Sequence, residues 1–249
     1  MRIALFSDIH GNREALAACL HHAERQKAER LVFLGDLVGY GADPGWVVET
    51  VRACVARGDA IALLGNHDEA AASPRGAVGM NDVAAAAIGW TRRQLDPEAV
   101  AFLASLPLVA EDGERLYVHA DASAPGRWRY VTSAEAALRS LSATEARVTI
   151  CGHVHVPALF GLTATEKLVS HRPAPGVAVP LLRPRRWLAV LGAVGQPRDG
   201  DPRACYGLLD TDSSELTWVR VPYDVAAAAA KIRAAGLPEL LAERLERGR

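Results

Sequence analysis

The chain has 249 residues, of which 50% are hydrophobic and 23% are charged, and this composition excludes a mainly disordered protein. Its 28 Lys and Arg residues nearly balance its 29 Asp and Glu residues, so no global field favours a long nucleic acid or an anionic membrane. The chain starts with too few apolar residues before Asp8 for a signal peptide, and no apolar run reaches the length of a membrane span. We therefore expect a cytoplasmic protein with no membrane partner.

The first part of the chain alternates short apolar runs with helical patterns. The runs at residues 2–7, 31–34 and 60–64 each end in a polar cluster, and helical spacing follows the first of them. A second helical pattern begins after Pro44, a residue that favours helix starts. This alternation predicts parallel βαβ units, in which ligands bind at the carboxyl ends of the strands.

Residues 80–106 are rich in alanine and helical in spacing, and Pro97 marks the start of a second helix there. Short β-like runs separated by turn residues then follow, at residues 116–119, 147–151, 158–162, 187–193, 204–210 and 216–221. We interpret the last two as a hairpin and predict a second, mostly antiparallel sheet. Two helices, at residues 223–235 and 237–247, close the chain. No linker marks a boundary, so we predict a single domain over residues 1–249.

Five polar blocks stand at the ends of predicted strands and contain five of the eight histidines. The blocks are Asp8-Ile9-His10, Gly35-Asp36, Gly65-Asn66-His67-Asp68, His119 and Gly152-His153-Val154-His155. Each block alone is weak evidence, because such short patterns occur by chance in many chains. Their shared position at strand ends is what indicates a functional site.

Acids and imidazoles gathered in this way suit a site for two metal ions. Two divalent cations about 3.5 to 4 Å apart need an anionic ligand between them, and Asp36 is the candidate for this bridge. Asp8 and His10, two residues apart in a loop, can both turn toward one ion. Asn66 offers a neutral carbonyl oxygen, which keeps the site from repelling a phosphate.

The last block adds two further imidazoles. His153 and His155 would alternate as strand residues do and would therefore serve different ions. Ligands of the Asp, Asn and His types suit Mn, Fe or Zn, and the sequence does not select among them.

In this order, the five blocks resemble the pattern of the calcineurin-like metallophosphoesterases. The stretch 195–203, the Tyr223-Asp224 pair and the closing helix after Leu237 look like the small bacterial phosphodiesterase-like branch of that superfamily. The resemblance implies an α/β fold, an α/β/β/α sandwich of two stacked mixed β-sheets flanked by helices. It also implies a dinuclear metal site at the rim formed by the strand ends.

The resemblance further implies which residues hold each ion and which act on substrate. One ion would be bound by Asp8, His10, Asp36 and His155, and the other by Asp36, Asn66, His119 and His153. His67 would face the substrate, oriented by Asp68. We expect two divalent ions, Mn before Fe, Zn, Ni, Co or Mg. A hydroxide that bridges them would attack phosphorus in line while His67 stabilises the departing oxygen.

Two further residues, Asn12 and Arg198, are candidates for substrate contacts. The branch usually carries Asn-Pro-Gly-Ser-Val-Gly before Gln-Pro-Arg, but here the serine is replaced by Ala193 and Asn-Pro is absent. None of the replaced residues belongs to the predicted ligand set. We therefore expect the metals to remain and only phosphate or rim contacts to change.

The favoured hypothesis is a metal-dependent phosphoesterase that acts on a small phosphate ester. A phosphodiester is favoured over a phosphomonoester, a phosphoprotein or a dinucleoside polyphosphate, all of which the same site could cleave. A nuclease acting on long nucleic acid is disfavoured by the net charge of −1. A non-catalytic protein-interaction scaffold is the alternative of another class, and the complete set of site residues argues against it. The oligomeric state is not predicted.

Overall fold

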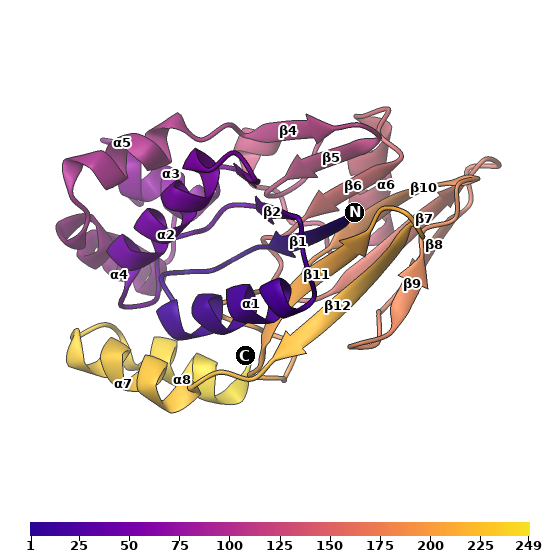
Figure 1. Cartoon of the computed structure of the whole chain (residues 1–249). Coiled ribbons are helices and arrows are strands. Elements are labelled where there is room, and N and C mark those ends of the chain that lie inside the picture. Colours follow the sequence, from indigo (N-terminus) through magenta and orange to yellow (C-terminus); the bar gives the residue numbers. More distant parts are fainter.

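The computed structural model describes all 249 residues and contains two stacked six-stranded sheets with helices on their outer faces (Figure 1). The strand order is β3-β2-β1-β11-β12-β9 in the first sheet and β4-β5-β6-β10-β7-β8 in the second. The first sheet comprises β1 (Arg2–Phe6), β2 (Arg30–Phe33), β3 (Ala60–Ala62), β9 (Ala178–Pro180), β11 (Ala204–Asp210) and β12 (Glu215–Val221). The second comprises β4 (Val109–Asp112), β5 (Arg115–Val118), β6 (Val148–Cys151), β7 (Ala158–Thr163), β8 (Leu168–His171) and β10 (Arg185–Val190).

Eight α-helices surround the sheets, and none of them is both long and apolar enough to cross a bilayer. They are α1 (Arg13–Arg25), α2 (Pro44–Ala56), α3 (Asn66–Ala72), α4 (Asp82–Gln94), α5 (Pro97–Ser105), α6 (Ala134–Ser142), α7 (Val225–Ala234) and α8 (Glu239–Arg247). Pro44 and Pro97 begin helices as their sequence context predicts. Gly236, with a φ of +68°, separates the two closing helices.

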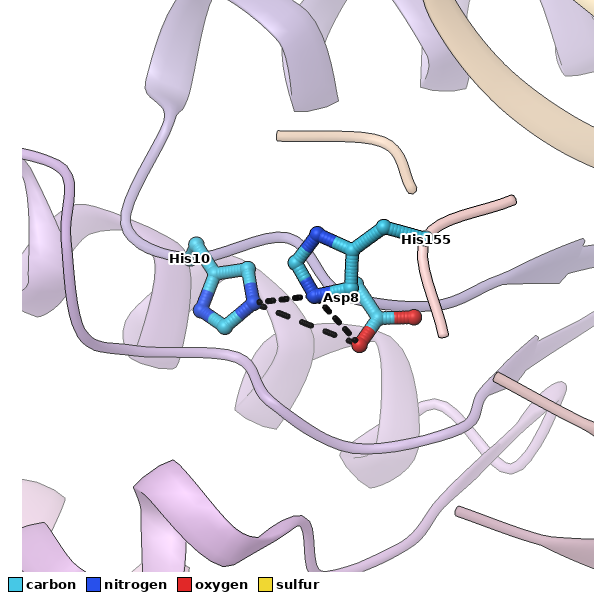
Figure 2. A group of neighbouring side chains, drawn as sticks. All are labelled: Asp8, His10 and His155. Atoms are coloured by element: carbon cyan, nitrogen blue, oxygen red, sulfur yellow. Dashed lines mark hydrogen bonds and ion pairs between the residues drawn. The ribbon is translucent and has the colours of Figure 1, made fainter. Parts of the chain in front are cut away.

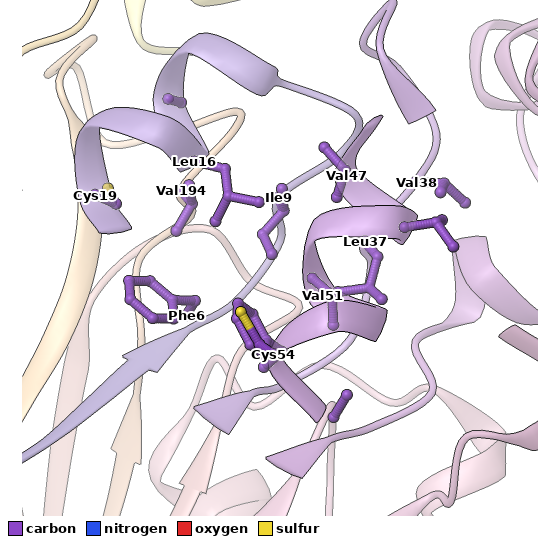
Figure 3. Packing of buried hydrophobic residues seen from close by; sticks show 14 of the residues in the cluster. Phe6, Ile9, Leu16, Cys19, Leu37, Val38, Val47, Val51, Cys54 and Val194 are labelled. Carbon is purple, nitrogen blue, oxygen red and sulfur yellow. The ribbon is translucent and has the colours of Figure 1, made fainter. Parts of the chain in front are cut away.

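The alternation of side chains along β1 explains the layers. Ile3 and Leu5 pack into the cluster between the two sheets, whereas Ala4 and Phe6 pack against the helices that cover the first sheet. Figure 3 shows Phe6 in this second cluster. A further apolar cluster lies between the second sheet and α6. The order of layers is therefore helix, sheet, sheet, helix, and the expected α/β/β/α sandwich of two mixed sheets is confirmed.

The predicted hairpin forms, but it belongs to a different sheet from the one expected. β11 and β12 pair antiparallel, and β11 also pairs antiparallel with β1, so both strands extend the first sheet. In the second sheet three of the five strand pairs are antiparallel, as expected, while β6 lies parallel to both β5 and β10, so that sheet is mixed. The hairpin joins the first sheet because one edge of β1 is free to pair with β11. Nothing in the local sequence of the hairpin specifies which strand edge the hairpin will join.

The carboxyl ends of the ligand-bearing strands meet at one side of the sandwich. β1, β2 and β3 run parallel in the first sheet, and β5 and β6 run parallel in the second. The polar blocks follow these five strands directly. The topology therefore brings residues that are distant in sequence to a common rim.

Candidate metal centre and substrate cavity

The first group of possible metal ligands consists of Asp8, His10 and His155 (Figure 2). The Nε2 atoms of His10 and His155 lie 3.1 Å apart. Asp8 Oδ1 lies 3.2 Å from Nε2 of His155 and 4.0 Å from Nε2 of His10. All three side chains are buried, so the three ligand atoms face one small volume at the end of β1.

The second group consists of Asp36, His119 and His153. Nε2 of His119 lies 3.2 Å from Nδ1 of His153 and 3.4 Å from Oδ2 of Asp36. The same Oδ2 atom is 3.7 Å from Nε2 of His10, a member of the first group. One oxygen of Asp36 therefore lies between the two groups, where a bridging ligand is required.

Backbone carbonyls fix the orientation of all four imidazoles. The ring nitrogens that point away from the centre contact Val38 O (His10), Leu34 O (His119), Gln196 O (His155) and Trp128 O (His153). Because a carbonyl can only accept, each of these nitrogens carries the proton of the neutral ring. The inward nitrogens are then lone pairs, and they face each other at 3.1 and 3.2 Å. A cation between them, either a metal ion or a proton on one of the two rings, removes this repulsion.

The donor set fits two divalent ions. Donor atoms about 2.1 Å from one metal, at angles of about 90° to 110°, are separated by about 3.0 to 3.4 Å. The two imidazole pairs and the contacts of Asp8 and Asp36 with His155 and His119 fall in this range, at 3.1, 3.2, 3.2 and 3.4 Å. Oδ1 of Asn66 is buried without a hydrogen-bond partner, so it has a lone pair free for a metal.

The pKa shifts also indicate that these side chains surround a place for positive charge. Burial disfavours the charged form of His119, but the carboxylates of Asp36 and Asp8 together with the Leu34 carbonyl outweigh burial and raise the pKa of His119 to about 9. Burial together with the charge on His119 lowers the pKa of His153 to about 4. Burial opposes ionisation of Asp36 as well, yet the facing histidines, His119 first, hold its pKa well below the usual range. A proton on His119 thus supplies the positive charge that a metal would supply.

The ligand loops adopt an unusual backbone conformation. Positive φ angles occur at Asp8 (55°), His10 (51°), Asp36 (52°), His153 (67°) and His155 (64°). Residues other than glycine rarely adopt these values, and they cluster where function imposes them. The expectation that His153 and His155 alternate as strand residues is therefore wrong, because both lie in a left-handed turn beyond β6. They nevertheless belong to different ligand groups, as predicted.

Apolar residues placed next to the ligands hold these loops. Ile9, between Asp8 and His10, packs into the core under α1 and α2, and so does Leu37, next to Asp36 (Figure 3). The loop after β6 in the second sheet lies close to the loop after β1 in the first. A Cβ on Gly152 would meet the side chain of Ser7 and, at 2.6 Å, Oδ2 of Asp8. Gly152 is therefore required for close approach of two backbones.

His67 and Asp68 lie on the first turn of α3, and the contact expected between them is absent. The two oxygens of Asp68 accept hydrogen bonds from the amides of Val38 and Gly65, at 3.1 and 3.0 Å. Nδ1 of His67 is buried without a partner. Asp68 therefore fixes the turn that carries Asn66 and His67, and it does not orient the His67 ring through a hydrogen bond.

His67 remains close to the ligands, and its charge is suppressed. It forms a third possible ligand group with His10 and Asp36. Its amide donates to Oδ1 of Asp36 at 2.8 Å, which leaves Oδ2 free to face the histidines. Burial lowers the pKa of His67, so the ring is neutral at neutral pH. A neutral imidazole can still donate one hydrogen bond to a substrate oxygen.

The two candidate substrate contacts have different surroundings. Oδ1 of Asn12 caps α1 by accepting from the amide of Ala15, and its Nδ2 donates to Gly195 O at 2.9 Å. Asn12 is buried with both polar groups engaged, so in this structure it tethers the loop, and its expected contact with substrate stays a prediction. Arg198 is half-buried, lies 5.8 Å from the ring centre of Tyr40, and has an Nε without a partner.

The departure at Ala193 lies in the core and not at the rim. Ala193 is fully buried, and its carbonyl accepts from the amide of Cys205. It does not line the cavity that Asn66, His67 and His153 border. The expected change in phosphate or rim contacts therefore finds no basis here, and the ligand set is intact.

A cavity of about 460 Å³ lies beside the ligands. Asn66, His67 and His153 border it on the side of the ligands, and the aromatic rings of Trp128 and Tyr130 also line it. The sequence reasoning missed both aromatic residues, because a tryptophan and a tyrosine in a loop carry no pattern of their own. Tyr40, which stands between two glycines in the loop after β2, lines the cavity as well.

Comparison with known proteins identifies the class that this fold and site define. Residues 1–214 match the calcineurin-like phosphoesterase superfamily domain, and the chain belongs to that superfamily. The superfamily consists of metal-dependent phosphoesterases with dinuclear centres, which supports hydrolase activity in general.

Individual proteins are similar along the whole chain. A crystal structure of a metallophosphoesterase from Sphaerobacter thermophilus is 38% identical, with a TM-score of 0.88 and coverage of 100% of this chain and 99% of that one. An uncharacterized protein of Methanocaldococcus jannaschii is 34% identical over 99% of this chain and 98% of its own length. A hypothetical protein of Pyrococcus horikoshii shares the fold at 19% identity, with a TM-score of 0.79 and coverage of 100% and 98%.

Proposed function

We propose that the protein hydrolyses a small phosphate ester, preferably a phosphodiester, with the help of two divalent cations, Mn²⁺ first among them. The observation that carries this proposal is the pair of facing imidazole couples, His10 with His155 and His119 with His153, with one oxygen of Asp36 between them. The ions would be held by Asp8, His10, Asp36 and His155 on one side and by Asp36, Asn66, His119 and His153 on the other.

When bound, the cations would neutralise phosphate charge and lower the pKa of water to near neutrality, which supplies the nucleophile. The protein's own residues would position the reacting groups. His67 lines the cavity as a neutral imidazole and would donate a hydrogen bond to the leaving oxygen. Arg198, close to Tyr40 and to His67, would attract a phosphate oxygen.

The cavity favours a diester. A diester has one negative charge and two organic substituents, whereas a monoester carries up to two charges and one substituent. The cavity of about 460 Å³ has room for a second substituent, and Arg75 is the only Lys or Arg side chain in its lining. A monoester dianion, a phosphoprotein or a dinucleoside polyphosphate would gain less from such surroundings.

The test compares three substrates, bis(p-nitrophenyl) phosphate, p-nitrophenyl phosphate and diadenosine tetraphosphate. Each is assayed with protein stripped by a chelator and with the same protein reloaded with Mn²⁺. We expect hydrolysis only after reloading, with the highest kcat/KM for the diester. A matched pair of histidine variants provides the control: His119→Ala should lose activity, whereas His21→Ala, with a side chain 69% exposed, should keep it.

Undiminished hydrolysis by the stripped protein would contradict the metal-dependent reaction. A higher kcat/KM for the monoester or the polyphosphate would keep the reaction class and replace the preferred substrate.

A further inference from the structure

The cavity beside the candidate metal centre has an aromatic wall. The ring of Tyr130 stacks on the imidazole of His153, with centroids 4.1 Å apart and an angle of 8° between the planes. Because His153 belongs to the second ligand group, the ring of Tyr130 provides a flat aromatic surface next to the candidate metal centre. Tyr130 is 53% exposed, so this surface is accessible to a ligand.

Trp128 belongs to the same aromatic wall, and hydrogen bonds fix both its side chain and its backbone. Its indole Nε1 donates to Oε2 of Glu69 at 2.8 Å, and its carbonyl accepts from Nε2 of His153 at 2.9 Å. The backbone of Trp128 adopts a left-handed φ of 53°. The polar edge of the indole is therefore satisfied within the protein, and no substrate is needed to fix it. Such pre-ordering lowers the entropy lost on binding.

The remaining lining combines aliphatic and polar side chains and carries little charge. Val78, Met80 and Ala84 contribute aliphatic atoms, and Val78 is 83% exposed. Arg75 is the single cationic side chain apart from histidine, and the single carboxylate, Glu69, is engaged by Trp128. Polyanions and charged peptides would find few partners in this lining, whereas an apolar ring would bury its faces there.

We propose that this cavity binds a planar, uncharged ring carried by the phosphate ester, such as a nucleobase or an aryl group, with Trp128 and Tyr130 as the specificity-determining residues. The proposal rests on the proposed function, since it places the phosphate at the metal centre. The volume of about 460 Å³ lies within the range of small-molecule sites, roughly 300 to 1,000 Å³. Stacking of the ring on the aromatic wall would add to the attraction of the phosphate.

The experiment measures binding without turnover. Calorimetry on the Mn²⁺-loaded protein compares phenylphosphonate with methylphosphonate, which carry the same anionic group and differ in the ring. We expect phenylphosphonate to bind about tenfold more tightly, as base stacking on aromatic side chains does elsewhere. Trp128→Ala and Tyr130→Ala should each reduce this ratio severalfold. Tyr130→Phe, which keeps the ring, and Arg127→Ala, at an exposed neighbour outside the lining, should leave it unchanged.

Equal affinity for the two phosphonates in the unaltered protein would overturn the proposal, and so would the absence of binding of either. A preference that survives in both alanine variants would overturn the assignment to Trp128 and Tyr130. Turnover separates this inference from the proposed function. Hydrolysis of phosphodiesters without a ring preference contradicts the cavity assignment alone, whereas a ring preference without hydrolysis contradicts the activity alone.

Discussion

The Nε2 atoms of His10 and His155 lie 3.1 Å apart, and the other nitrogen of each ring contacts a backbone carbonyl. Two lone pairs therefore face each other inside the protein, beside the carboxylate of Asp8 (Figure 2). Water cannot relieve the repulsion, because all three side chains are buried. The fold thus holds a geometry that costs free energy in the absence of a cation.

Asp36→Asn should reduce metal binding more than the loss of any ligand that belongs to one group. Oδ2 of Asp36 lies between His10 and His119, so removing its charge affects both ligand groups. We expect fewer than one Mn²⁺ per chain in Asp36→Asn and about one in Asn66→Ala, as measured by equilibrium dialysis and elemental analysis. Asp82→Asn, at an exposed acid on α4, is the control and should retain two. Two ions in Asp36→Asn would mean that another residue is the bridge.

His67→Ala should slow turnover while both ions stay bound. His67 lines the cavity and, as a neutral ring, would donate a hydrogen bond to the leaving oxygen. The loss should be about 10²- to 10⁴-fold for a diester with an alkoxide leaving group. It should be smaller for p-nitrophenolate, which leaves without help.

Kinetics at saturating Mn²⁺ with both leaving groups test this prediction for His67. An equal loss for both leaving groups would instead indicate a role in positioning the substrate. Loss of one metal ion in His67→Ala would place the residue in the ligand set, where its proximity to His10 and Asp36 would also allow it to act.

A pair of glycine variants tests the close approach of the two sheets. Gly152→Ala introduces a Cβ against Ser7 and Asp8, so it should destabilise the protein by about 1 to 3 kcal/mol. Gly89→Ala, in the middle of α4 with no atom nearer than 4.0 Å to the new Cβ, should stabilise it by about 0.5 to 1 kcal/mol. Urea unfolding measures both changes. A neutral Gly152→Ala would show that the ligand loops can move apart.

The cluster of candidate metal ligands was predictable because metal binding restricts the residue type and the strand pattern fixes the place of each residue. Asp36 and His119 are recognisable in the sequence for this reason, although they lie 83 positions apart. The site's cavity was not predictable in the same way. Any apolar residue can form a cavity wall, so Trp128 looks no different in sequence from Trp218, which is buried between the sheets.

Long-range pairing accounts for the other differences. The hairpin of β11 and β12 is a local feature with a clear turn, and it formed as expected. Its attachment to β1 depends on a free strand edge about two hundred residues away, which no local pattern records. Likewise, Asn12 is a helix cap by its local sequence, but its hydrogen bond to Gly195 O comes from the tertiary structure, which no local pattern records.

The stability of the metal-free protein should decrease as pH rises above neutrality. Asp36 raises the pKa of His119 to about 9 from an ordinary value of 6.5, and burial raises the pKa of Asp68 to about 8 from 3.8. A group with a raised pKa in the folded state binds its proton more tightly there than in the unfolded chain. His119 therefore stabilises the fold fully below pH 6.5, and this contribution is lost as pH rises to about 9. The stabilising contribution of the Asp68 proton is lost as pH rises from 3.8 to about 8.

Thermal unfolding of chelator-treated protein between pH 6 and pH 9 tests this expectation. The unfolding temperature should fall steadily as pH rises across this range. In His119→Gln the unfolding temperature should depend less on pH between pH 7 and pH 9, because the group that binds the proton is gone. Saturating Mn²⁺ should raise the unfolding temperature at every pH, since an ion that binds the folded state stabilises it by mass action. Mn²⁺ should raise the unfolding temperature most at pH 9, because His119 no longer has to release a proton there before it binds the metal. A metal-induced increase that is larger at pH 6 than at pH 9 would contradict the assignment of His119 as a ligand, because there the proton and the metal compete for the same nitrogen.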